Sequence, residues 1–174
     1  HSLLRLDRLR EHHRVQRVAL TPTDLLHASG RFCRWDVASA SAGCELLARL
    51  VGAEPDALIA DLHERFIRRL ATELLKKQLD ARAEPEAMDE CPVCRELLDN
   101  LLSGGDGALT VSVRLAHPVI GIGAPVDAFL PAAAERIGAE VIIPHDADVA
   151  NAIGAVTSNV VITRTVHIRP DEQG

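Results

Sequence analysis

The stretch PVIGIGAPVDAF, residues 118–129, decides the fold that the sequence predicts. A short apolar run leads into a glycine-rich turn and then into a helical pattern, as where a buried strand precedes a helix. The stretch EVIIPHDADVANAIGAV, residues 140–156, repeats this order of apolar run and helix. Because strands joined by a helical crossover lie parallel, we expect the strands at 118–122 and 140–143 to be parallel neighbours.

The flanking stretches extend this pattern in both directions. ALTVSVRLA (108–116) alternates like a half-buried strand, and NVVITRTVHI (159–168) predicts a final strand. Before residue 104 the sequence predicts only helices, which start after the cap residue Thr21, at Asp36, at Pro55 and near Cys94. We therefore expect an α/β protein with a helical region over 1–104 and an α/β region over 105–174.

Composition and charge exclude several classes of protein. The net charge of −6 argues against a dedicated nucleic-acid binder, and the 2% aromatic content leaves no stacking platform for bases. No apolar run is long enough to span a membrane, and the charged start HSLLRLDRLREHHRV does not resemble a signal peptide. Four cysteines without such a signal favour the cytoplasm. Since both ends interrupt a regular pattern, we expect the chain to be part of a longer protein.

The glycine turn suggests a ligand site. Gly121 and Gly123 lack Cβ atoms, so a flat ligand could lie against the backbone. Pro125 removes one N–H donor and the Asp127 carboxylate would cap the following helix, so both disfavour a phosphate and favour the neutral adenosine part of a nucleotide. A plain turn between strand and helix is the alternative.

The last predicted helix, DADVANAIGAV, could form a second side of the ligand site. Asn151 and Gly154 stand among alanines at helical spacing, so this face could admit a flat ligand. Close packing of the helix on a sheet explains the same small residues.

Two segments of the chain resemble a known family. PVIGIGAPVDAFLPAAAERIGAEVIIPHDADVANAIGAV resembles the end of the ATP-binding core in the hydantoinase A/5-oxoprolinase family, and ALTPTDLLHASGRFCRWD resembles a second hallmark of that family. That family is part of the ATPase superfamily of actin, Hsp70 and the sugar kinases, which implies that 105–174 is the C-terminal part of an RNase H-like lobe. The resemblance makes Gly121, Gly123, Ala124 and Pro125 the adenosine-side loop, with Asn151 and Gly154 opposite.

The resemblance also implies a chemistry. Such enzymes use ATP and Mg²⁺ to phosphorylate a carbonyl oxygen of a cyclic amide before hydrolysis, or to activate a ketone for carboxylation. The phosphate loop and the acidic Mg²⁺ ligands of the superfamily do not occur in this sequence, so the chain alone should be inactive and its catalytic residues are unknown. The implied partners are ATP, a small cyclic amide or ketone, and either further copies of the chain or a second type of subunit.

Other residues leave competing hypotheses open. Cys91 and Cys94 form a C-x-x-C motif that could act as a redox pair, could join Cys33 and Cys44 in a zinc site, or could remain free thiols. The helices over 36–51 and 54–83 could instead form the interface of a non-enzymatic interaction module. His27, which follows the T-P-T-D segment, is expected to cap or pack, although a substrate or interface role is conceivable.

Overall fold

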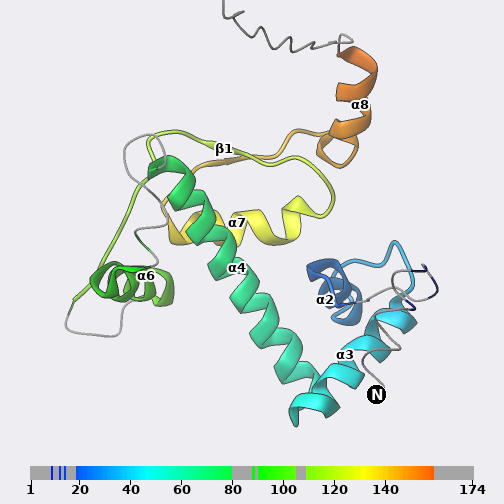
Figure 1. Ribbon diagram of the computed structural model, residues 1–174. Helices are drawn as coiled ribbons and strands as arrows, with labels where there is room; N and C mark the ends of the chain where they lie inside the picture. The colour runs from blue at the N-terminus through cyan, green and yellow to red at the C-terminus, as the bar shows by residue number, and fades with distance from the viewer. Residues whose placement is uncertain are drawn as a thin grey trace, which may run out of the picture.

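The computed structural model describes residues 9, 12, 14, 19–79, 88, 90–104 and 109–158. The helices α2, α3, α4 and α6 come first, followed by an α/β part with two short strands (Figure 1). Their bounds, in chain order, are α2 Pro22–Ala28, α3 Val37–Val51, α4 Pro55–Leu79, α6 Pro92–Ser103, β1 Val119–Ile120, α7 Val126–Arg136, β2 Val141–Ile142, the 3₁₀ helix η1 Ala147–Val149 and α8 Ala150–Thr157.

The helix starts predicted from local sequence are confirmed. Thr21 and Asp24 form a capping box at α2, because the Thr21 hydroxyl accepts from the Asp24 N–H and the Asp24 carboxylate accepts from the Thr21 N–H. Asp36 caps α3 by accepting from the Ser39 N–H at 3.1 Å. Gly52 ends α3 in the left-handed conformation, and Pro55 opens α4.

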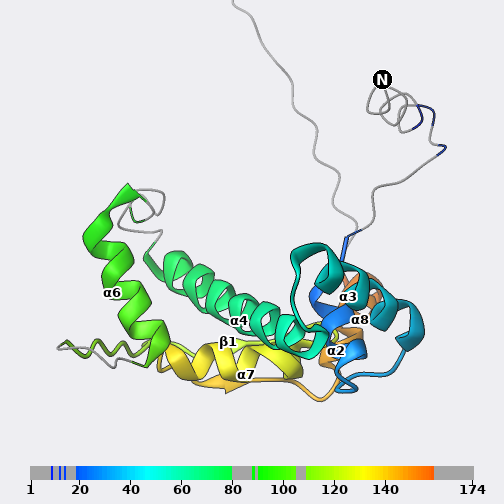
Figure 2. The same cartoon turned by 90° about the horizontal axis from the view of Figure 1, so that it is seen from below.

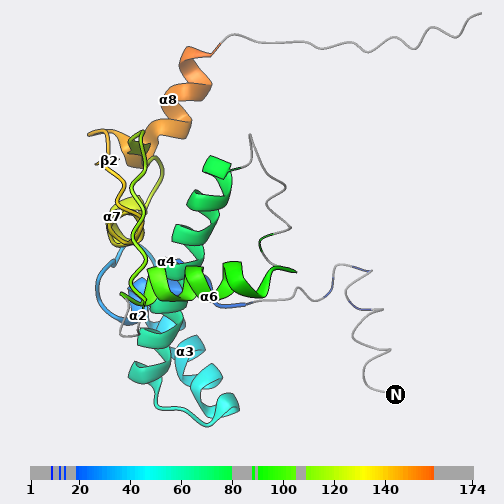
Figure 3. The ribbon, with the colours of Figure 1, turned by 90° about the vertical axis from the view of Figure 1, so that its left-hand side faces the viewer.

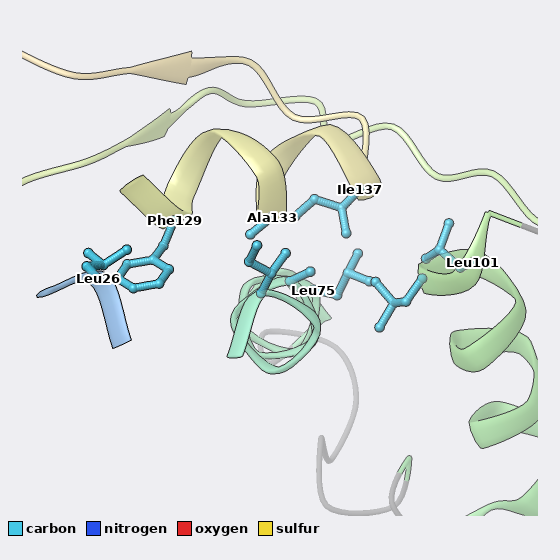
Figure 4. Close-up of a cluster of buried hydrophobic side chains, with 9 residues drawn as sticks. Leu26, Leu75, Leu101, Phe129, Ala133 and Ile137 are labelled. Carbon is cyan, nitrogen blue, oxygen red and sulfur yellow. The ribbon is translucent and has the colours of Figure 1, made fainter. Parts of the chain in front are cut away.

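The long helix α4 is the centre of the core. Figure 4 shows buried side chains of α2, α6 and α7 gathered beside those of α4. The cluster consists of Leu26, Ile67, Ala71, Leu75, Leu101, Leu102, Phe129, Ala133 and Ile137. Described residues from both sides of position 104 therefore share one hydrophobic core.

The predicted parallel strand pair is confirmed. Val119 lies opposite Val141 and Ile120 opposite Ile142, and the Gly121 N–H donates to the Ile142 carbonyl at 2.9 Å. Helix α7 packs between this pair and α4, and Figure 1 shows it crossing α4. Together the described elements make a mostly helical α/β fold with a small parallel sheet.

The strand predicted over 108–116 is wrong for its described residues, 109–116, which form no strand. The backbone there pairs with a side chain instead of a neighbouring strand: the Asn100 amide donates to the Leu109 carbonyl at 2.6 Å and accepts from the Val111 N–H at 3.0 Å. The strand predicted over 159–168 lies outside the described residues. Among the helices that the structure describes, none is long and apolar enough to cross a bilayer.

An ion pair joins three helices at the centre of the fold. Both guanidinium N–H groups of Arg136, on α7, bind the Glu64 carboxylate of α4 at 2.6 and 2.7 Å, and one of them also reaches the Leu102 carbonyl of α6 at 3.2 Å. The hydrogen bonds from Arg136 hold the pKa of the Glu64 carboxyl below its ordinary value, against the opposing effect of burial.

This pair makes stability depend on pH. Because the folded-state pKa of Glu64 is lowered, the pair contributes fully to the free energy of unfolding above about pH 5. This contribution is lost as the pH falls below the ordinary glutamate pKa of about 4.3. Glu64→Gln should therefore lower the free energy of unfolding by about 1 kcal/mol at pH 7, the upper end for partly exposed pairs. Urea unfolding at pH 7 and pH 3.5 measures it.

Asp61→Asn is the matched control, because Asp61 pairs with Arg65 on the same helix with both side chains more than half exposed. It should cost about 0.3–0.5 kcal/mol, as exposed pairs four residues apart do. Equal losses of stability for the two variants, or a Glu64→Gln loss that is the same at both pH values, would contradict the stabilising role of the Arg136–Glu64 pair.

Candidate nucleotide site

The two glycines of the turn after β1 have different structural roles. Gly121 is buried, and a Cβ there would lie 2.5 Å from the Leu130 side chain and 2.7 Å from that of Val126. Gly123 has a φ of 96° with open space around its missing Cβ, and its N–H donates to the Ala147 carbonyl at 2.6 Å. Close packing on α7 therefore explains Gly121, whereas the turn conformation explains Gly123 and leaves its surface free.

The start of α7 differs from the prediction in one respect. Asp127 lies in the first turn, but no side chain makes a capping hydrogen bond to this helix, so the predicted Asp127 cap does not form. Pro125 stands at the N-cap position, after a cis Ala124–Pro125 bond, and offers no N–H itself. The exposed Asp127 carboxylate is left facing the space beside the turn.

The segment after β2 lies next to this turn. Ala147 is buried, and its carbonyl accepts the hydrogen bond from the Gly123 N–H. The exposed His145 ring contacts the Asp146 carboxylate at 3.0 Å. Both segments follow the carboxyl ends of parallel strands, which is where ligands bind in open α/β sheets.

A cavity of about 250 Å³ opens between these two segments. It brings together three of the predicted site residues, Gly123, Ala124 and Pro125, with Asp127 and residues 143–145, 147 and 148. Gly121 lines a larger apolar groove of about 440 Å³ on the side that faces α4, and Gly123, Ala124 and Pro125 line this groove as well. The polar cavity is the candidate site because, of the two, only it is also lined by residues that follow β2.

The other two predicted residues lie elsewhere. Asn151 and Gly154 are exposed on α8, and a Cβ on Gly154 would meet no atom within 4 Å. Helix α8 has no buried residue and projects away from α4 and α7 (Figure 3). Its small residues therefore pack against neither the sheet nor the cavity in this structure.

The cavity has a third wall that sequence reasoning missed. Phe32 and Arg34, from the loop between α2 and α3, line it opposite the glycine turn. The Arg34 guanidinium binds the Asp148 carboxylate at 3.3 Å, across 114 positions of the sequence. Phe32 and Arg34 belong to the segment ALTPTDLLHASGRFCRWD, whose family resemblance marked it as functional. The local sequence does not show, however, where this segment packs in the fold.

His27 holds this loop in place. Its ring is 2% exposed and stacks on the Trp35 ring, with centroids 5.5 Å apart. The Trp35 backbone N–H donates to Nε2 at 3.1 Å and Nδ1 donates to the Thr23 carbonyl at 2.7 Å, which fixes the neutral tautomer. The packing role expected for His27 is confirmed.

The polar groups around the cavity are suited to one part of a nucleotide. Two carboxylates, Asp127 and Asp148, face one guanidinium, Arg34, so the cavity wall is net acidic and disfavours a triphosphate. The carboxylates can accept hydrogen bonds from ribose hydroxyls. The volume lies just below the range of about 300–1,000 Å³ common for small-molecule sites, which suits one portion of a ligand.

The cysteines do not assemble a metal site. Within the described part of the chain, no group of three or more histidine, cysteine, aspartate or glutamate side chains is arranged to hold a metal ion. The zinc set of Cys33, Cys44, Cys91 and Cys94 is therefore not brought together, and all four are free thiols. No arrangement for Mg²⁺ is found among these residues either.

Comparison with known proteins adds no assignment: no family model matches the chain, and neither a curated protein nor a solved structure matches it significantly.

Proposed function

We propose that this chain supplies the adenosine side of the nucleotide site in an ATP-dependent enzyme of the hydantoinase A/5-oxoprolinase type. One observation carries the proposal. The two segments that resemble this family lie about 100 positions apart in the sequence, yet residues of both line one cavity beyond the carboxyl ends of β1 and β2. This convergence supports a shared ligand-binding role for both segments.

The chemistry of the cavity supports adenosine over phosphate. Pro125 removes the N–H that a phosphate would use at the start of α7, and the carboxylates of Asp127 and Asp148 outnumber the cation Arg34. Gly123 leaves room for a flat ring against the backbone. The phosphates and Mg²⁺ would then be held by the second lobe of such an enzyme, with the present residues in an RNase H-like lobe.

The proposed reaction is activation of a carbonyl by ATP, for hydrolysis of a small cyclic amide or carboxylation of a ketone. The present residues would bind and orient the nucleoside, and Mg²⁺ and phosphate-binding groups would stabilise the transferring phosphoryl group. The proposed setting is the cytoplasm, which the four free thiols support. Assembly with further copies or a second type of subunit belongs to the same proposal.

Adenosine binding tests the proposal directly. The 174-residue chain should bind adenosine saturably in an NMR titration, with shifts centred on residues 123–127 and 143–148, and inorganic triphosphate should not compete. Gly123→Val should weaken adenosine binding at least about ten-fold, because the branched side chain enters the space of the ring.

Gly104→Val is the matched control. Gly104 also has a positive φ, 80°, with open space around its missing Cβ, but it ends α6 and does not line the cavity. It should carry a similar backbone strain and keep normal binding. If Gly123→Val stays folded and binds adenosine normally, or if triphosphate alone produces the shifts, the cavity is no adenosine site.

A further inference from the structure

Two thiols lie together at the first turn of α6, far from the nucleotide cavity. Cys91 occupies the N-cap position and its sulfur accepts a hydrogen bond from the Cys94 N–H at 3.3 Å. Residues three apart on a helix have Cβ atoms about 5–6 Å apart, and a disulfide needs Cβ atoms about 3.5–4.5 Å apart, so the first turn must bring them about 1–2 Å closer to close the bond. Both residues are half-buried, so their sulfurs can be reached from solvent.

The two thiols have opposite tendencies to ionise. Hydrogen bonds from the Cys94 thiol and the Cys94 N–H lower the pKa of the Cys91 thiol below its ordinary value, and the Arg95 charge adds to this effect. The pKa of the Cys94 thiol is raised, first because it donates that hydrogen bond to Cys91 and then because of burial. Cys91 is thus the thiol of the pair that ionises more readily.

The other two cysteines lack this arrangement. Cys44 is 1% exposed on α3, and burial raises the pKa of its thiol. Cys33 is exposed, but its sulfur donates to the Gly30 carbonyl, at 3.8 Å, and does not accept from a helix N–H. Neither forms a pair with a second thiol at a helix start.

The position of the pair allows oxidation without disturbing the core. Leu101 and Leu102, in the last turns of α6, belong to the hydrophobic cluster, and Arg68 of α4 binds Asp99 at 2.8 Å. The first turn lies at the opposite end of α6, away from α7 (Figure 2). A bond formed there would change only the cap of this helix.

We propose that Cys91 and Cys94 form a redox-active dithiol that reacts with low-molecular-weight disulfides. The Cys91 thiolate attacks one sulfur of a disulfide RS–SR, forms a mixed disulfide and releases RS⁻, which takes up a proton. The Cys94 thiol then gives up its proton and attacks the Cys91 sulfur, which forms the internal disulfide and releases the second RS⁻, again protonated to RSH. Two protein thiols are oxidised, and one RS–SR is reduced to two RSH.

The test uses the reduced 174-residue chain and glutathione disulfide, with time points trapped by alkylation and mapped by mass spectrometry. We expect an internal Cys91–Cys94 bond that forms at least about ten times faster than glutathione adds to Cys33, because thiolate fraction and an adjacent resolving thiol both favour it. Cys94→Ser should stop at a stable mixed disulfide on Cys91. Cys91→Ser should slow reaction at Cys94 by at least about ten-fold, since it removes the thiol of the pair that ionises more readily.

Cys91→Ser should keep the start of α6, because serine is a good N-cap residue. Circular dichroism should match the unmodified chain, and Cys33→Ser should leave the rate of internal bond formation unchanged. Modification of Cys33 as fast as Cys91, accumulation of a stable mixed disulfide in the unsubstituted chain, or an unreactive Cys91 in Cys94→Ser would overturn the proposal.

Discussion

Gly138→Ala is expected to destabilise the protein by about 3 kcal/mol, the sum of about 1 kcal/mol for a left-handed residue and about 2 kcal/mol for overpacking. Gly138 follows α7 with a φ of 56°. A Cβ at this position would overlap the Val113 carbonyl oxygen and lie 3.1 Å from the Arg114 Cα. Both neighbours are backbone atoms, so no side-chain rotation can relieve the overlap. Urea unfolding of the variant and the unsubstituted chain measures the difference.

Gly104→Ala separates the two contributions. Gly104 has a φ of 80°, and a Cβ there would meet no atom within 4 Å. It should therefore cost only about 1 kcal/mol, from the left-handed conformation alone. If Gly138→Ala cost no more than Gly104→Ala, the extended segment before β1 would not lie against the end of α7 in solution.

His27→Ala should cost about 3 kcal/mol, because it leaves a cavity beside Phe32 and Trp35 and an unpaired Trp35 N–H. The loop that carries Arg31 and Arg34 should also loosen, since the ring is its link to α2. Thermal unfolding gives the loss of stability, and the rate of tryptic cleavage after these arginines reports the loop.

His117→Ala is the control for this change, since His117 is exposed and should stay within about 0.5 kcal/mol of the unsubstituted chain. A stable His27→Ala variant with unchanged cleavage would mean that His27 does not order the loop. Its place in the T-P-T-D segment would then need a functional explanation.

Features of the fold could be predicted from the sequence where the interacting groups lie close together in the chain. The starts of α2 and α3 could be predicted because each cap joins residues only three positions apart, as Thr21 with Asp24 and Asp36 with Ser39. The parallel strand pair was also predictable, since a helix between two apolar runs leaves few other arrangements.

The strand expected over 108–116 could not be corrected from the sequence. Its alternating pattern is that of a half-buried strand, but its backbone is bound by the side chain of Asn100 on α6. The alternation of apolar and polar residues predicts which side chains are buried, but it does not predict which group will form the hydrogen bonds of the backbone.

For the candidate site, the sequence by itself determined the glycine turn, the proline at the start of α7 and the T-P-T-D segment, because each depends on backbone conformations set by neighbouring residues. Only the tertiary structure decided that Gly121 packs against α7 while Gly123 faces a cavity, that Arg34 meets Asp148 there, and that α8 lies outside it. Those outcomes depend on how α7 and the loop after α2 dock on one core around α4, and docking is governed by contacts between residues far apart in the chain.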